Sequence, residues 1–130
     1  KDIHKLEMVQ RKAVRFIFNS YHSRASPSLL MENNNIMTLE HRRQVARLSF
    51  LFLLNSQQFN INPGLYIQPR LSRSTRSTHE HNLTPIFART NLFKHSFFPR
   101  TIERWNRLPV DVFSARDVSD FEKRVLSAIF

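Results

Sequence analysis

The chain has 130 residues, which is enough for one folded domain but short for two. Its formal net charge of +10 favours a polyanion as partner, with nucleic acid the first candidate and an anionic membrane surface the second. The lack of cysteine excludes disulfides, thiol nucleophiles and thiolate zinc sites, and twelve Phe against one Gly exclude a disordered tail. We therefore expect a single basic domain over residues 1–130.

Residues 2–21 are predicted to form the first helix. Apolar side chains recur there at helical spacing within one arc, and basic side chains occupy the opposite side. The apolar positions are Ile3, Leu6, Val9, Ala13, Phe16 and Ile17. Because this pattern is already under way at Lys1, we expect the chain to be a piece of a longer protein.

Two more helices are expected before residue 57. Ser26 followed by Pro27 predicts a short helix over residues 27–32, ended by the three asparagines at 33–35. Thr38 is predicted to cap a longer helix over residues 39–55, whose second half is apolar nearly all round. Such a helix belongs at the centre of a fold.

The first half of that third helix carries a cluster of cations. Positive charge at a helix N-terminus opposes the helix dipole, so an external anion or an acidic neighbour is one interpretation. An ordinary solvated face is the other. The residues are His41, Arg42, Arg43 and Arg47.

Residues 57–83 are predicted to be a flexible basic loop, because no hydrophobic periodicity survives among their Pro, Ser, Thr and Arg residues. Two short apolar runs follow, residues 84–88 and 92–97, around Arg89, Thr90 and Asn91. These runs predict a short β-hairpin or two extended pieces before the penultimate helix. The predicted fold class is therefore mainly α, a small helical domain with this one β element.

The penultimate helix is predicted over residues 99–107, because Pro99 suits a first turn and Leu108 precedes Pro109. One face is apolar, and we expect it to bury Trp105 in the core. The other face carries arginines at the same spacing. The apolar face is Phe98, Ile102 and Trp105, and the basic face is Arg100, Arg104 and Arg107.

A last helix is predicted from Ser119 to Phe130. Ser119 and Glu122 have the spacing of a capping box, and Phe121, Val125 and Ile129 are expected to point inward.

No catalytic centre is predicted. The acidic residues form no carboxylate pair for two-metal phosphoryl transfer, and no serine stands in a glycine-flanked elbow. His79 and His81 flank Glu80, and with His95 they offer a set of metal ligands, but solvated histidines are the preferred interpretation. We expect no catalytic residue, no metal and no cofactor.

Positive charge is concentrated between residues 66 and 107, where eight cations face only Glu80 and Glu103. Cations neutralise phosphates, and Tyr66, Phe97, Phe98 or Trp105 would stack a base if exposed. The predicted nucleic-acid-binding residues are Arg70, Arg73, Arg76, Arg89, Lys94, Arg100, Arg104 and Arg107.

Three segments resemble one family of proteins. The run SFFPRTIERWNRLP, residues 96–109, is similar without a gap to a segment near the C-terminus of non-LTR (LINE-type, Jockey-like) retrotransposon polyproteins. LEMVQRKAVRFI, residues 6–17, and the L-E-x-R-R-x-x-x-R-L pattern from Leu39 resemble the same family in the same order. The resemblance implies a segment that follows the reverse-transcriptase domain.

The resemblance implies that catalysis lies upstream, since the chain lacks the family's Y/F-A-D-D palm motif and its Cys/His zinc knuckle. The parent polyprotein would be an RNA-directed DNA polymerase with an endonuclease. The expected function is non-catalytic binding of template RNA or target DNA, beside the upstream polymerase region. The alternative is a structural interaction domain that packs on that region without touching nucleic acid.

Membranes and small-molecule substrates are not expected partners. The longest apolar run, residues 50–54, is far shorter than the roughly 20 residues of a membrane span. No predicted helix combines a broad basic face with a long exposed apolar face, so a membrane-surface module ranks last. With no signal-peptide pattern at its start, the protein is expected in the nucleus and cytoplasm and not outside the cell.

Overall fold

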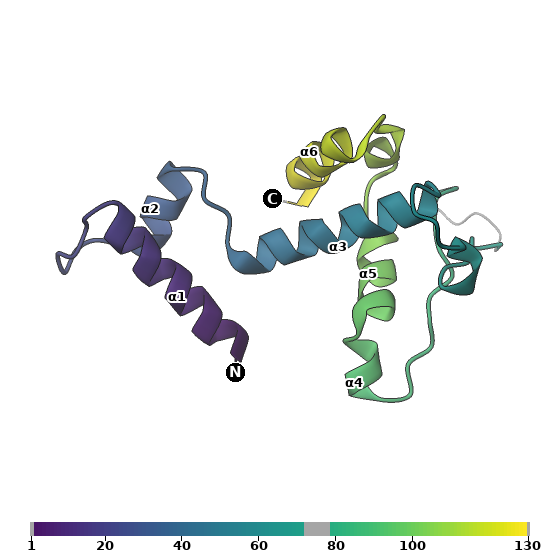
Figure 1. Cartoon of the computed structure of the whole chain (residues 1–130), viewed down its shortest axis with the longest axis horizontal. Helices are drawn as coiled ribbons and strands as arrows, with labels where there is room; N and C mark the ends of the chain where they lie inside the picture. Colours follow the sequence, from purple (N-terminus) through teal and green to yellow (C-terminus); the bar gives the residue numbers. More distant parts are fainter. Residues whose placement is uncertain (1, 72–78, 130) are drawn as a thin grey trace. The chain divides into compact units, whose positions relative to one another are not determined.

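The computed structural model describes residues 2–71 and 79–129, and within them the chain is mainly helical (Figure 1). The predicted fold class of a small helical protein is confirmed. The α-helices are α1 (Asp2–Ile17), α2 (Pro27–Asn33), α3 (Leu39–Asn55), α4 (Asn91–Lys94), α5 (Phe97–Trp105) and α6 (Val118–Ile129), and the 3-10 helices are η1 (Pro63–Leu65) and η2 (Val110–Ser114).

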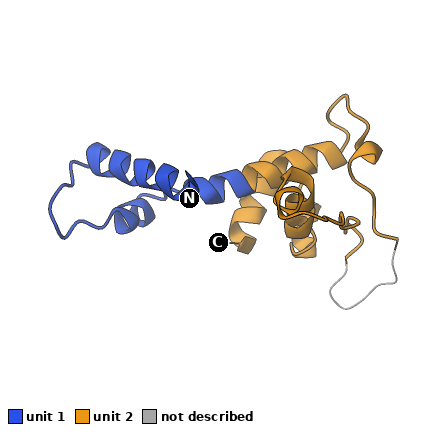
Figure 2. Cartoon of the chain, turned by 90° about the horizontal axis from the view of Figure 1, so that it is seen from below, with its two compact units in different colours: residues 1–44 blue, residues 45–130 orange. Residues whose placement is uncertain are grey.

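The backbone divides into two compact units, residues 1–44 and 45–130 (Figure 2). Helix α3 begins in the first unit and ends in the second. Two units that share one helix unfold either together or in separate steps. A single domain over residues 1–130 therefore stays a prediction.

In the first unit α1 packs against α2, with Val14 and Met31 as its buried hydrophobic residues. Helix α1 ends at Ile17, before the predicted residue 21. The reason is Asn19, whose φ of 45° lies in the left-handed region that ends helices. The Ser20 N–H then closes the end by donating to the Arg15 carbonyl at 2.9 Å.

The starts of α2 and α3 follow the predicted caps. The Ser26 hydroxyl accepts a hydrogen bond from the Leu29 N–H at 3.5 Å, and the Thr38 hydroxyl accepts one from the His41 N–H at 3.2 Å. Each cap satisfies an N–H that has no partner inside its helix. The predicted bounds of α3 are confirmed, and α2 ends one residue later than predicted.

Glu7 of α1 is an acidic neighbour for the N-terminus of α3. Its carboxylate accepts from the Leu39 N–H at 3.3 Å and from the Glu40 N–H at 2.8 Å, and it lies 3.4 Å from the Arg43 guanidinium. A carboxylate at the first N–H groups of a helix stabilises the helix, because its negative charge interacts favourably with the positive end of the helix dipole. For Arg43 the acidic neighbour is therefore within the chain itself.

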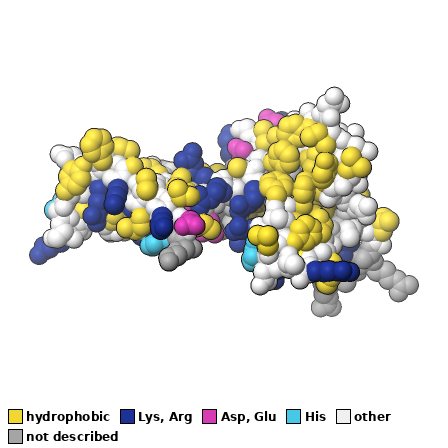
Figure 3. Space-filling view, turned by 60° about the horizontal axis from the view of Figure 1, so that its bottom comes forward, with side chains coloured by type: hydrophobic (Ala, Val, Ile, Leu, Met, Phe, Trp, Pro, Cys, Tyr) yellow, Lys and Arg dark blue, Asp and Glu magenta, His cyan; other side chains and the backbone are white. Residues whose placement is uncertain are grey.

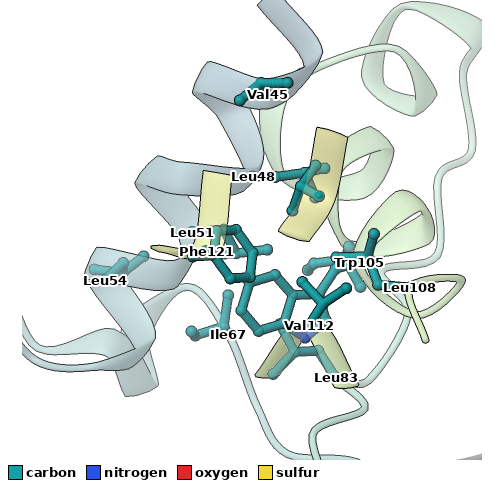
Figure 4. Close-up of a cluster of buried hydrophobic side chains, with 12 residues drawn as sticks. Val45, Leu48, Leu51, Leu54, Ile67, Leu83, Trp105, Leu108, Val112 and Phe121 are labelled. Carbon is teal, nitrogen blue, oxygen red and sulfur yellow. The ribbon is translucent and has the colours of Figure 1, made fainter. Parts of the chain in front are cut away.

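The core of the second unit lies between α3, α5 and α6 (Figure 4). Helix α5 crosses the C-terminal half of α3 (Figure 1), so the leucines of α3 meet Trp105. The Phe121 ring stacks on Phe52 with centroids 4.4 Å apart. The central place predicted for α3 is confirmed by the buried set Val45, Leu48, Leu51, Leu54, Ile67, Leu83, Ile102, Trp105, Leu108, Val112, Phe121 and Val125.

Helix α5 has the predicted faces but lies two residues earlier than predicted, at Phe97–Trp105. Pro99 occupies a later position of the first turn, where its missing N–H still needs no partner. After Trp105 the hydrogen bonding changes to the 3-10 type, because the Arg107 and Leu108 N–H groups donate to carbonyls three residues back at 3.1 Å each. Ile102 and Trp105 are buried and Phe98 is half-buried, as predicted.

The predicted β-hairpin over residues 84–97 is wrong. The Thr90 hydroxyl accepts a hydrogen bond from the Phe93 N–H at 3.2 Å and caps helix α4. Thr90 and Asn91, predicted to lie in the turn between two strands, are therefore the start of a helix. Residues 84–88 form no strand in the described structure, and lead into α4 as irregular chain.

Helix α6 begins one residue earlier than predicted, and its cap differs. The Asp120 N–H donates to the Asp117 carboxylate at 2.7 Å, and the Asp120 carboxylate accepts from the Arg116 N–H at 3.3 Å. This reciprocal pair replaces the predicted Ser119 and Glu122 box. Instead, Glu122 accepts a hydrogen bond from the Ser49 hydroxyl of α3 at 2.8 Å.

Candidate nucleic-acid interface

Trp105 and Asn106 bind the backbone of the segment that follows residue 78. The Trp105 indole N–H donates to the His81 carbonyl at 2.9 Å. The Asn106 amide donates to the Leu83 carbonyl at 2.8 Å and accepts from the Leu83 N–H at 2.9 Å. These two side chains, adjacent in the motif of residues 96–109, therefore fix residues 81–83 against α5.

The same segment holds Arg70 in place. Pro69 and Leu83 form an isolated antiparallel bridge, in which the Arg70 N–H donates to the Asn82 carbonyl at 2.9 Å. Leu83 of the bridge and Ile67, two residues before Pro69, are buried in the core. The predicted loop of residues 57–83 is therefore anchored at Ile67, Pro69 and Leu83, and the bridge places Arg70 beside α5.

A groove of about 630 Å³ lies beside this bridge. Its cations are Arg70, Lys94 and Arg107, and its one carboxylate is Glu103. Residues 85–88, Pro99 and Asn106 complete the lining. We call this feature the cationic groove.

Arg107 of the cationic groove forms an exposed ion pair. Its guanidinium lies 2.6 Å from the Glu103 carboxylate one helical turn back, and their side chains are 69% and 55% exposed. Exposed pairs of this kind contribute little to stability because water screens them. The ion pair therefore orients the Arg107 guanidinium but holds it only weakly. A phosphate can replace the Glu103 carboxylate as its partner.

The structure brings together three of the eight cations predicted to bind nucleic acid. Arg70, Lys94 and Arg107 line the groove, whereas Arg89 and Arg104 are exposed outside its lining. Arg100 is half-buried and engaged in an interaction of its own. The remaining two, Arg73 and Arg76, lie outside the described residues.

Of the four aromatic residues predicted to stack a base if exposed, Tyr66 is 46% exposed, Phe97 and Phe98 are half-buried, and Trp105 is in the core. Tyr66 stacks on Phe98 with centroids 5.2 Å apart, Phe97 meets Phe50 edge-on at 5.3 Å, and Trp105 is buried. Phe87 was missed, yet it lines the groove and is 83% exposed.

The signal that would have revealed Phe87 is Pro85. A proline so close to the middle of a short run argues against a paired strand, because it removes a ladder hydrogen bond. A phenylalanine in an unpaired run beside arginine is a candidate contact residue.

His79 and His81 lie beside each other, with ring centroids 6.1 Å apart, and both pack on an aromatic cluster. Their rings lie 4.7 Å and 4.8 Å from the Phe113 ring, which contacts Trp105 at 4.8 Å. Burial lowers the pKa of His79 below 6.5, and the charge of a protonated His81 lowers it further. The Leu108 backbone and Glu80 oppose these effects.

This lowered pKa predicts a loss of stability in mild acid. The unfolded chain, in which His79 titrates near 6.5, takes up its proton at a higher pH than the folded protein. The free energy of unfolding should therefore fall as pH drops through 6.5, and level off below the folded-state pKa. Denaturant unfolding of the parent and His79→Gln between about pH 8 and pH 5 measures this.

The control for that measurement is His95→Gln, at an exposed position. It should follow the pH profile of the parent, while His79→Gln shows a shallower one. Parallel profiles for all three proteins would contradict the assignment to His79.

Within residues 2–71 and 79–129, no group of three His, Asp or Glu side chains is placed to hold a metal ion. In the same residues, every helix is too short or too polar to span a bilayer.

Comparison of the chain with protein-family models, curated proteins and solved structures gives no match. The parentage implied by the motif of residues 96–109 therefore stays a prediction, and the candidate site is argued from its own residues.

Proposed function

We propose that this chain is a non-catalytic segment of a non-LTR retrotransposon polyprotein that binds template RNA or target DNA through the cationic groove. The observation that carries the proposal is the meeting of Arg70, Lys94 and Arg107, which come from three separate parts of the chain. Cations gathered in one groove neutralise successive phosphates of a strand.

The motif of residues 96–109 supports the proposal in a second way. Pro99, Asn106 and Arg107 of the motif line the groove, and Asn106 fixes the segment that positions Arg70. The residues that carry the family resemblance therefore also build the candidate site. Arginine suits this role because its planar fork donates two parallel hydrogen bonds to a phosphate.

Salt dependence tests the proposal. The full chain should bind single-stranded RNA and DNA with little sequence preference, and log K should fall linearly with log salt. Three phosphate contacts by the groove predict a contribution to the slope of about −2, since each contact contributes about −0.7 on a single strand. Fluorescence anisotropy of labelled strands at several salt concentrations measures it, and no binding at low salt would refute the proposal.

The second candidate is the structural interaction domain, and α1 supports it. The rest of the first unit leaves an apolar face of α1 uncovered, with Val9, Phe16 and Ile17 exposed by 63%, 75% and 68%. Hydrophobic side chains are visible on the surface of this unit in Figure 3. The expectation that no helix combines a basic face with a long exposed apolar face is therefore wrong for α1, whose Lys5, Arg11 and Lys12 are exposed as well. An exposed apolar face of a helix is typical of a protein or membrane contact.

The interaction candidate predicts association with the separately expressed upstream polymerase region. Replacing Val9 and Phe16 by Ser should weaken that association, because both contribute exposed apolar area that a partner would bury. Size-exclusion chromatography of the mixture distinguishes the two candidates when nucleic-acid binding is measured on the same variant.

A further inference from the structure

Phe87 is held outward by the chain on either side of it. Its neighbour Ile86 packs against the hydrophobic core, whereas Phe87 is 83% exposed and lines the cationic groove. Ile86 and Ala88, on either side of Phe87, are both partly buried, so the Phe87 ring lies on the outer side of this segment. The ring is therefore presented by the fold of residues 85–88.

An exposed phenylalanine among cations is a specific combination. A phenyl ring on the surface orders water at a free-energy cost, and large aromatic side chains usually find burial. In the cationic groove the ring shares its surroundings with Arg70, Lys94 and Arg107. Proteins that bind unpaired nucleic acid combine these two parts, cations for the phosphates and an aromatic ring for the bases.

A paired duplex does not use both parts. Its bases are stacked on each other and offer only their edges, so a phosphate-binding surface needs no exposed ring. An unpaired base has a free face that stacks on an aromatic side chain.

The groove volume of about 630 Å³ lies within the range of about 300 to 1,000 Å³ that is typical of small-ligand pockets.

We infer that the cationic groove binds an unpaired strand, with one base stacked on Phe87 and adjacent phosphates on Arg70, Lys94 and Arg107. This inference rests on the proposed function, because it assumes that the groove binds nucleic acid. It adds that part of the affinity comes from a base stacked on Phe87 and not from charge, so that an unpaired strand should bind more tightly than a duplex.

The test compares three ligands of equal length: a single strand, the same strand with abasic residues throughout, and a duplex. The abasic strand keeps every phosphate and removes every base. The full chain should bind the ordinary strand roughly five- to 150-fold more tightly than the abasic one, which is the effect of one stacked base. Phe87→Ala should remove that difference and leave the salt slope unchanged, since no phosphate contact is lost.

Three further variants make the result specific. Phe87→Trp should keep the preference for bases, whereas Phe87→Leu, which is apolar but has no aromatic face, should lose it. Leu92→Ala is the control, because Leu92 is 87% exposed but lies outside the groove lining. It should behave like the parent protein.

The outcomes separate this inference from the proposed function. If the chain binds no ligand at low salt, the proposed function fails and the inference fails with it. If it binds ordinary and abasic strands equally, the proposed function stands and stacking on Phe87 is refuted. Loss of binding to phosphatidylserine vesicles in Phe87→Ala, with strand binding unchanged, would assign the ring to a membrane contact and also overturn the inference.

Discussion

Trp105→Ala is expected to lower the free energy of unfolding by about 3 to 5 kcal/mol, a large share of the stability of a small protein. The side chain is 1% exposed, and its ring contacts Phe113 and Phe121 at 4.8 Å and 5.8 Å. Its removal leaves a cavity in the core and strips the His81 carbonyl of its hydrogen bond. Denaturant unfolding of the second unit measures the loss.

Trp105→Phe apportions that loss. It keeps most of the ring but cannot donate to the His81 carbonyl, so we expect a smaller cost of about 1 to 3 kcal/mol. If Trp105→Ala instead unfolds at the same denaturant concentration as the parent and only loses affinity for nucleic acid, the role of Trp105 is in binding and not in the core.

The variant with Arg70, Lys94 and Arg107 replaced by Gln is expected to have the largest effect on binding. If each cation contacts one phosphate of a single strand, the salt slope becomes shallower by about 2. At about 0.1 M salt the affinity then falls roughly 100-fold. Stability should change little, because all three side chains are exposed.

A matched variant controls for net charge. Replacing Lys5, Arg11 and Lys12 of α1 by Gln also removes three exposed cations, but none of them lines the cationic groove. This protein should keep most of the affinity and the slope of the parent. Equal losses in both variants would show that binding follows net charge alone, and an unchanged slope in the groove variant would overturn the proposed function.

Helices were predictable from the sequence where local signals agreed. Thr38 and the leucines that follow it define α3 correctly, because the cap and the hydrophobic pattern both depend on nearby residues. The end of α1 was missed although Asn19, like the asparagines at 33–35, tolerates the positive φ that ends a helix, because apolar residues continue at helical spacing up to it. The hairpin failed because Thr90 and Asn91 suit a helix start as well as a turn.

The candidate site was only partly predictable. Charge density identified Arg70, Lys94 and Arg107, but also five cations outside the groove lining or outside the described residues. Tertiary contacts decide which cations line the groove. The bridge between Pro69 and Leu83 and the amide of Asn106 join segments that are distant along the chain. No short-range pattern encodes such contacts. Phe87 was missed for the related reason that its exposure follows from the burial of Ile86.

The bonds made by Trp105 and Asn106 have a consequence for how relatives of this chain should diverge. All three bonds end on main-chain atoms of residues 81 and 83, and none on a side chain. A main-chain carbonyl is the same whatever residue carries it, so the bond from Trp105 does not require histidine at position 81, although the His81 ring also packs on Phe113 at 4.8 Å. Among relatives we therefore expect a retained Trp-Asn pair facing a segment in which position 81 needs only a ring that packs on Phe113 and position 83 only a buried apolar side chain.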